Sequence, residues 1–344
     1  MTKQTALVVC PGRGTYNAKE LGYFNKYHSD KKFFLHELDT LRQSKGQRTI
    51  SELDGAGKFS SGTHGTGENA SLLIYACAMA DFHAINREKY DIVAITGNSM
   101  GWYLALAASG TLSLMDGAHL VNEMGALMHK NGSGGQIVYP IVDSEWKTDP
   151  KRVQLVQNIL EDSRKTKSVK IYTSIKLGGM IVFAANDAGL KYLMQNLPEE
   201  EHFPLKLNNH NAFHSPILDA IVPMAKSNLS ASIFTPPSTP LIDGQGVIWQ
   251  PYLANTQSLY DYTLGEQINS TYDFSAAINV GIKEFAPDKI IVLGPGTTMS
   301  APVAQELIEQ KWLNFAGKED FKFRQSDDPF VISMGMDDQR KFAL

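Results

Sequence analysis

One serine in this chain lies in a segment that would make it a nucleophile. Ser99 is the centre of GNSMG at 97–101, which directly follows the apolar run DIVAIT at 91–96 and leads into the helical pattern YLALAASG at 103–110. Glycines at both ends allow a sharp turn from strand to helix, which leaves the serine hydroxyl exposed at a helix N-terminus. The segment therefore predicts a nucleophilic serine, and the alternative is a glycine turn with a structural role.

A serine hydroxyl is a weak nucleophile and needs a base within hydrogen-bond reach. Of the nine histidines, His214 lies in NNHNAFHSPI, where the chain returns from a predicted small unit to a larger one. Because a cleft is expected at such a junction, we predict that His214 is the base for Ser99. The alternatives are a polar loop residue or, with His210 four positions earlier, a zinc site for which the sequence offers no third ligand.

Strands and helices alternate around this serine. Continuous β-branched runs indicate strands of a parallel sheet that is covered on both faces, and they occupy 6–10, 91–96 and 289–294. Helical patterns separate these runs at 70–85, 103–110 and 115–130. This alternation predicts an α/β fold, resembling that of the α/β-hydrolases, with functional groups at the carboxyl ends of the strands.

The segment 131–205 differs from the rest of the chain. It begins with NGSGG and continues in the order strand, helix, strand, strand, helix, strand, which is typical of a ferredoxin-like unit. We therefore expect a ferredoxin-like small subdomain at 131–205, inserted into a large catalytic lobe that consists of 1–130 and 206–344. The pocket is expected in the cleft between them. The polar segment 44–66 is expected to be surface loop.

Composition and charge exclude several kinds of partner. The chain has 344 residues, of which 43% are hydrophobic, and a formal net charge of −4, so no basic face for nucleic acid is expected. No apolar run approaches the length of a membrane span, and we expect no membrane partner. Cys10 and Cys77 lie outside any metal-ligand spacing and are expected to be reduced, buried thiols of a cytoplasmic protein.

Four segments together resemble the malonyl-CoA:acyl-carrier-protein transacylase family. In chain order they are PGRGTY at 11–16, GNSMG at 97–101, AFHSPI at 212–217 and LGPGTTM at 293–299. The resemblance implies a serine acyltransferase of fatty acid or polyketide biosynthesis with no metal and no tightly bound cofactor. It would transfer an acyl group by a ping-pong mechanism from an acyl-CoA, its substrate, to the phosphopantetheine thiol of its partner, an acyl carrier protein.

The resemblance also implies roles for individual residues. Ser99 would carry the acyl group, and His214 would accept the serine proton and later protonate the leaving thiol. A backbone carbonyl, matched here by Gln267, would orient the histidine. The amides of Arg13 and Met100 would form the oxyanion hole.

The predicted pocket departs from the family's pattern at several positions. The family usually has histidine before the nucleophile and an acidic residue after the second glycine, where this chain has Asn98 and Trp102. Malonyl-specific members carry on a later helix an arginine that binds the free carboxylate, and this chain has Met124 there. Uncharged acyl groups are therefore expected to be accepted at least as well as malonyl, unless Arg13 replaces that arginine. The predicted pocket residues are Asn69, Asn98, Trp102, Met124 and Phe213.

Two other functions are compatible with the same residues. In an acyl-thioester hydrolase, water would resolve the acyl-enzyme, and loss of the carboxylate-binding arginine suits such an editing role. A catalytically weakened homologue would instead act as a binding partner in a synthase, and the altered residues at 13, 98, 102 and 124 favour it. Retention of Ser99 and His214 argues against that second alternative.

Overall fold

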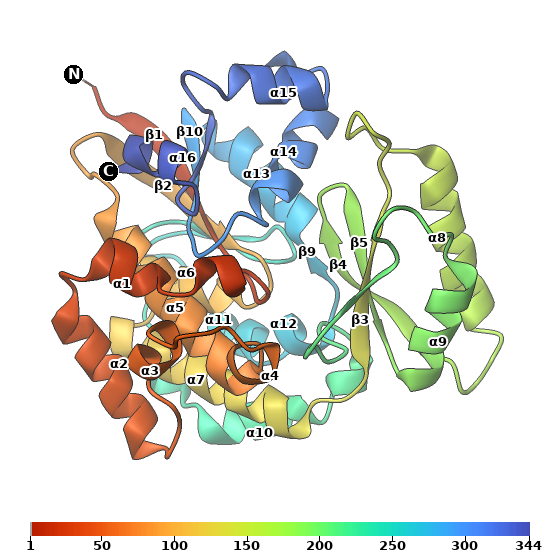
Figure 1. Cartoon of the computed structure of the whole chain (residues 1–344), viewed down its shortest axis with the longest axis horizontal. Coiled ribbons are helices and arrows are strands. Elements are labelled where there is room, and N and C mark those ends of the chain that lie inside the picture. Colours follow the sequence, from red (N-terminus) through yellow and green to blue (C-terminus); the bar gives the residue numbers. More distant parts are fainter. Residues whose placement is uncertain (1) are drawn as a thin grey trace.

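The computed structural model describes residues 2–344, which form two lobes with one sheet each (Figure 1). The large sheet has the strand order β11-β10-β1-β2-β7-β8, and every pairing except β7 with β8 is parallel. Its strands are β1 (Gln4–Cys10), β2 (Tyr90–Gly97), β7 (Leu241–Ile242), β8 (Ile248–Trp249), β10 (Lys289–Val292) and β11 (Val331–Ser333). The central strands β1 and β10 are buried almost throughout, which explains the apolar runs at 6–10 and 290–292 within them. The predicted α/β fold is confirmed.

Three helices position the candidate site against this sheet. They are α5 (Gly67–Ala84), α6 (Gly101–Ala108) and α7 (Leu114–Asn131). Thr66 caps α5 by accepting a hydrogen bond from the amide of Asn69. Because α5 is buried around nearly its whole circumference, it is apolar on all sides and shows no amphipathic stripe.

The small lobe has the expected ferredoxin-like arrangement. Its elements are β3 (Gly135–Pro140), α8 (Pro150–Ser163), β4 (Ile171–Leu177), β5 (Met180–Ala185), α9 (Asp187–Asn196) and β6 (Leu205–Leu207). The strand order is β6-β3-β5-β4 with antiparallel pairings, and β9 (Tyr272–Asp273) of the large lobe extends this sheet parallel to β4. Figure 1 shows α8 and α9 on the side of this sheet that faces away from the large lobe.

The small sheet is apolar on both faces. Side chains of a strand alternate between faces, and Ile137, Tyr139 and Phe183 form a separate core under α8 and α9. Val138 and Val182, on the opposite or inner face, belong to the main core of the large lobe. The inner face is therefore available to form a wall of the site between the lobes.

One region is more ordered than the sequence suggested. The segment 44–66, expected as surface loop, contains α3 (Ile50–Asp54) and α4 (Ser61–His64), and both helices bury residues. Thr49 and Glu52 form a capping box that starts α3. The charged C-terminal part contains α15 (Lys318–Arg324), β11 and α16 (Asp337–Ala343).

The other elements complete the large lobe. Its remaining α-helices are α1 (Tyr23–His28), α2 (Lys32–Ser44), α10 (Ile221–Asn228), α11 (Thr256–Thr263), α12 (Glu266–Asn269), α13 (Phe274–Phe285) and α14 (Ser300–Glu309). Short 3-10 helices lie at Ala18–Glu20, Pro216–Leu218, Ala231–Ile233 and Trp312–Asn314. Cys10 and Cys77 are free and buried. Within residues 2–344, helices of the length and apolarity needed to cross a membrane are absent.

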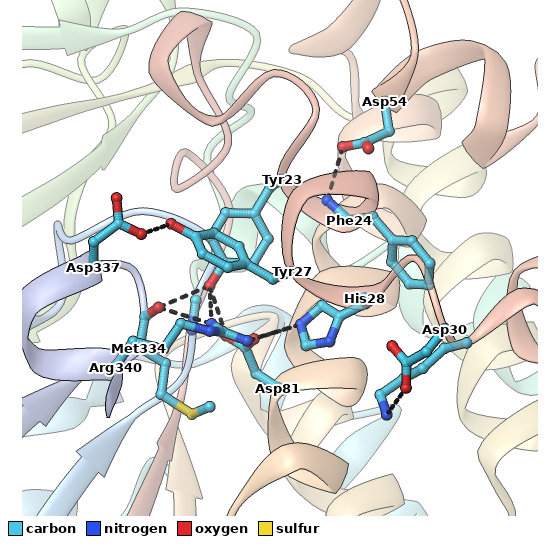
Figure 2. A network of polar contacts seen from close by, with 12 residues as sticks. Tyr23, Phe24, Tyr27, His28, Asp30, Asp54, Asp81, Met334, Asp337 and Arg340 are labelled. Carbon is cyan, nitrogen blue, oxygen red and sulfur yellow. Dashed lines mark hydrogen bonds and ion pairs between the residues drawn. The ribbon is translucent and has the colours of Figure 1, made fainter. Parts of the chain in front are cut away.

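A buried polar network joins both ends of the chain to α5 (Figure 2). The carboxylate of Asp81 accepts hydrogen bonds from Nε2 of His28 at 2.7 Å, from the hydroxyl of Tyr23 at 2.8 Å and from the amide of Gly294 at 2.8 Å. It also pairs with Arg340 of α16 at 2.7 Å. The network therefore connects α1, α5, α16 and the turn after β10.

Candidate active site

Ser99 lies in a tight turn between β2 and α6. Its φ of +56° is in the left-handed region that non-glycine residues seldom adopt. A side chain at Gly97 would overlap the backbone of Gly101, and one at Gly101 would overlap the carbonyl of Cys10. Only glycine at both positions allows this turn, which presents the serine hydroxyl beyond the carboxyl end of β2.

His214 contacts Ser99 directly. Its Nε2 lies 2.6 Å from the serine Oγ, and its Nδ1 lies 2.6 Å from the backbone oxygen of Gln267. Because a carbonyl oxygen can only accept, Nδ1 carries the proton and Nε2 accepts the hydrogen bond that the serine hydroxyl donates. Burial lowers the pKa of His214 to about 4, and the hydrogen bond to Gln267 opposes this shift in part. The imidazole is therefore neutral at pH 7 and its free nitrogen points at the serine.

The side chain of Gln267 braces the same turn. Its Nε2 donates to the backbone oxygen of Ser99 at 3.0 Å, and its Oε1 accepts from the hydroxyl of Tyr103 at 2.6 Å. Sequence reasoning did not identify Tyr103, although its position four residues after Ser99 places it one helical turn along α6. Through α12, Gln267 thus holds the serine turn and the histidine in one fixed arrangement.

Two backbone amides border the serine from different segments. The amides of Arg13 and Met100 both belong to residues that line the cavity beside Ser99. Throughout residues 2–344, neither amide has a hydrogen-bond acceptor on another protein group. The segment before Arg13 packs closely on the serine turn, since a side chain at Gly12 would meet the carbonyl of Asn98. Both amides are therefore available to a ligand oxygen.

A cavity of about 360 Å³, here called the Ser99 cavity, lies between the two lobes. Ser99 and His214 line it together with a wall from α7 and a wall from the inner face of the small sheet. Three of the five predicted pocket residues, Asn98, Met124 and Phe213, are among its lining residues. Most of the other lining side chains are aliphatic or methionine, which is typical of a site for an apolar ligand.

The predictions for Asn69 and Trp102 need correction, because neither residue lines the cavity. The Asn69 side chain accepts a hydrogen bond from the buried guanidinium of Arg42 and donates to the backbone oxygen of Thr63 at 2.9 Å. Trp102 is fully buried, and its indole N–H donates to Oγ1 of Thr263 at 3.0 Å. Both side chains hold helices together and do not face a substrate.

Arg13 is the charged side chain that lines the cavity. Its Nη2 donates to the backbone oxygens of Gly65 at 3.0 Å and Asn209 at 2.9 Å, and its guanidinium lies 5.5 Å from the ring centre of Phe213. Its Nε is buried and, across residues 2–344, has no hydrogen-bond acceptor. Burial lowers the pKa of Arg13 to about 10, so the group stays charged at pH 7.

His210, the other histidine at the lobe junction, is directed elsewhere. Its Nδ1 lies 2.8 Å from Oε1 of Gln136 in the small lobe, and it lines the cavity without contacting Ser99. Burial lowers the pKa of His210 well below its usual range, and the charge of Arg13 adds to this effect. Over residues 2–344, no three histidine, cysteine or acidic side chains gather in a group that could hold a metal ion. The zinc alternative thus has no ligand set in the described chain.

Comparison by sequence gives a limited match. No protein-family model matches the chain. It is 27% identical over 148 residues to the non-reducing polyketide synthase mapC of Penicillium brevicompactum. The matched segment is 43% of this chain but only 6% of the synthase, so the chain corresponds to a small part of that protein.

Comparison by structure extends over the whole chain. The malonyl-CoA:ACP transacylase of Synechocystis sp. superposes with a TM-score of 0.73 at 15% identity, over 98% of this chain and 99% of that one. The malonyl-CoA:acyl carrier protein transacylase of Xanthomonas oryzae superposes with a TM-score of 0.73 at 18% identity, over 100% of this chain and 98% of that one. The acyl-carrier-protein-S-malonyltransferase of Bartonella henselae superposes with a TM-score of 0.72 at 18% identity, over 99% of this chain and 98% of that one. From end to end, this chain has the two-lobed fold of the malonyl-CoA:acyl-carrier-protein transacylases.

Proposed function

We propose that this chain is a serine acyltransferase that moves an acyl group from acyl-CoA to the phosphopantetheine thiol of an acyl carrier protein. The observation that carries the proposal is the hydrogen-bonded series from Ser99 through His214 to the carbonyl of Gln267, beside a cavity between the lobes. A serine, a neutral imidazole and a group that orients it are the parts that activate a serine for acyl transfer. The shared fold of solved transacylases supports this reaction class.

In the first half-reaction, Oγ of Ser99 attacks the thioester carbonyl carbon while Nε2 of His214 accepts the hydroxyl proton. The carbonyl oxygen becomes negative and takes hydrogen bonds from the free amides of Arg13 and Met100. Collapse of this intermediate breaks the carbon–sulfur bond, and His214 returns its proton to the departing CoA sulfur. The products are the acyl ester of Ser99 and free CoA.

In the second half-reaction, the carrier thiol gives its proton to Nε2 of His214 and its sulfur attacks the ester carbonyl. The bond to Oγ of Ser99 then breaks, and His214 returns the proton to that oxygen. The Gln267 carbonyl orients the imidazole without placing a full negative charge beside it. The imidazolium formed in each step is therefore stabilised less than it would be beside a carboxylate, which favours prompt return of the proton.

For the acyl group, we propose that uncharged chains are accepted at least as well as malonyl. A carboxylate that enters a closed pocket loses its hydration, and this costs several kcal/mol unless a cation or several donors replace the water. The Met124 thioether cannot do so. Arg13 is the cation that lines the cavity, and its Nη2 already donates to two backbone oxygens.

The proposal is tested by the fate of the acyl group. Purified protein is incubated with acetyl-CoA and a holo acyl carrier protein, with free pantetheine as a second acceptor, and acyl thioester and free acid are both quantified. We expect acyl transfer to the carrier thiol to exceed hydrolysis. Hydrolysis that outpaces transfer to both thiols would instead identify an acyl-thioester hydrolase, and absence of any acyl-enzyme would favour the binding-partner alternative.

A further inference from the structure

The first wall of the Ser99 cavity is one face of α7. Val121, Met124 and Met128 line the cavity, and their spacing of three and four residues places them on the same side of the helix. Gly125 between them cannot be replaced, because a side chain there would meet the backbone of Gly67 and the side chain of Ser71. This wall offers a ligand aliphatic and thioether groups only.

The opposite wall is a continuous row of aliphatic side chains across the small sheet. Leu205 of β6 pairs with Val138 of β3, Val138 pairs with Val182 of β5, and Val182 pairs with Ile175 of β4. All four line the cavity. Leu205 is 44% exposed whereas Val182 is 1% exposed, so the row runs from the rim of the cleft into the interior.

Polar side chains of the two walls bond to the protein itself, whereas Nε of Arg13 and Oδ1 of Asn98, nearer the serine, have no partner within residues 2–344. The Ser71 hydroxyl donates to the backbone oxygen of Gly67 at 2.6 Å. Gln136 donates to Oγ of Ser174 at 2.6 Å, and its Oε1 bonds to His210. Among the described residues 2–344, no acidic side chain and no lysine lines the cavity. Away from Ser99 and Arg13, the α7 wall and the small-sheet wall therefore offer a ligand no charged group.

The cavity is also larger than a short acyl group requires. Its volume of about 360 Å³ corresponds to roughly twelve water molecules at about 30 Å³ each. An acetyl group has only three heavy atoms. Space is left for a longer chain even when the end of the pantetheine arm occupies the part next to Ser99.

We infer that the acyl group is an unbranched, uncharged aliphatic chain longer than acetyl, which lies between Met124 on α7 and the Val138–Val182 row of the small sheet. The inference rests on the proposed acyl transfer and adds its substrate class. Each methylene that moves from water into the cavity should raise kcat/KM about fourfold, the equivalent of about 0.8 kcal/mol. The rise should stop when the chain has filled the cavity.

The test compares acetyl-, butyryl-, hexanoyl-, octanoyl- and malonyl-CoA as donors for single-turnover acylation of Ser99. Intact-protein mass spectrometry measures the rate at which each acyl mass is added. We expect butyryl-CoA, which has two more methylenes, to exceed acetyl-CoA by about 15-fold and hexanoyl-CoA to exceed butyryl-CoA again. Acetyl- or malonyl-CoA as the best donor would overturn the inference while leaving the acyltransferase proposal intact. Failure of all five donors would instead contradict the acyltransferase proposal itself.

A substitution that fills the cavity locates the chain. Val138 lines the cavity and is 7% exposed, so the larger ring of Val138→Phe takes up cavity space, and the melting temperature of the variant shows whether it folds as wild type. The ratio of the acylation rate with hexanoyl-CoA to that with acetyl-CoA should fall at least tenfold, because hydrophobic pocket contacts discriminate on this scale. Val247→Phe, at a position 50% exposed, is the matched control. Equal losses for both donors in a folded Val138→Phe protein would contradict this location of the chain.

Discussion

Two of the buried histidines, His28 and His214, make hydrogen bonds shorter than 3 Å, and their surroundings differ in kind. His28 meets the carboxylate of Asp81, which also binds Arg340, whereas Nδ1 of His214 meets the uncharged backbone carbonyl of Gln267. A histidine beside a buried carboxylate resembles part of a catalytic triad, yet His28 does not line the Ser99 cavity. His214 does line it, and its second nitrogen faces a serine.

This difference shows which feature indicates chemistry. Both nitrogen–oxygen contacts are short, so hydrogen bonding alone does not separate the two histidines. His214 differs from His28 in its access to a cavity and in having a free nitrogen directed at a nucleophile. We therefore propose that the Asp81 network, with His28 and Arg340, stabilises the fold, and that the His214 cluster, with Ser99 and Gln267, carries out the reaction. Substitutions in the two groups should affect different measurements.

The largest expected effect is on the rate of acylation. Removing a general base typically lowers a rate by about 10² to 10⁴, so His214→Ala should lose that much of the acylation rate with acetyl-CoA. His28→Ala, measured per folded molecule at low temperature, should stay within about threefold of wild type, because it contacts no reacting group. Stopped-flow acylation of the two variants decides the comparison. A similar loss in both would show that the two clusters are not functionally distinct.

The second-largest expected effect is on the free energy of unfolding and concerns the Asp81 network. Asp81→Ala removes the carboxylate that neutralises Arg340, and leaving one partner of a buried pair uncompensated costs about 3–5 kcal/mol. Urea denaturation followed by circular dichroism measures this loss. Asp162→Ala, which breaks an exposed pair with Lys165 in the small lobe, is the matched control and should leave the midpoint nearly unchanged. Equal midpoints for the two variants would contradict the role given to Asp81.

The third effect concerns the acyl group. A charge-assisted hydrogen bond contributes about 1.5–3 kcal/mol, so Met124→Arg should shift the ratio of kcat/KM for malonyl-CoA to that for acetyl-CoA by roughly 10- to 100-fold toward malonyl. Arg13→Ala should leave the wild-type ratio nearly unchanged. A strong malonyl preference in the wild type that disappears in Arg13→Ala would instead make Arg13 the carboxylate ligand.

The smallest effect is the dependence on pH. His214 must be neutral to accept the serine proton, and burial holds its pKa at about 4, below the ordinary value for histidine. Acylation should therefore be constant between about pH 5 and 8 and fall about tenfold per unit below about pH 4. Rates are measured with acetyl-CoA while circular dichroism monitors folding. A fall that already begins near pH 6.5 in folded protein would show that His214 is not held neutral by burial.

Much of the fold could be predicted because the signals are local. The runs at 6–10 and 92–95 are buried almost throughout, so their sequences are apolar without interruption, and the order of strands and helices in the small lobe is characteristic. The helices at 50–54 and 61–64 were missed because their burial depends on contacts with distant segments. Asp54, for example, accepts a hydrogen bond from the hydroxyl of Tyr16, 38 residues earlier, and the backbone oxygen of Ser61 accepts one from Asn209, 148 residues later.

In the candidate site, too, the features set by local sequence could be predicted and those set by distant residues could not. The glycines around Ser99 are required by backbone packing that is local to the turn, and the context of His214 is equally local. The direction of the Asn69 and Trp102 side chains is not local, since it is set by Arg42 and Thr263 from other helices. Tyr103 was missed because its partner Gln267 is 164 residues away in the sequence.

The central claim is that Ser99 carries the acyl group, and intact-protein mass spectrometry tests it most directly. After incubation with hexanoyl-CoA and acetyl-CoA in separate reactions, the wild type should gain one acyl mass in each, and peptide mapping should place it on Ser99. Ser99→Ala should gain none, whereas Ser326→Ala, a change of the same size at an exposed turn, should behave as wild type. Acylation of Ser99→Ala at the wild-type rate would contradict the account.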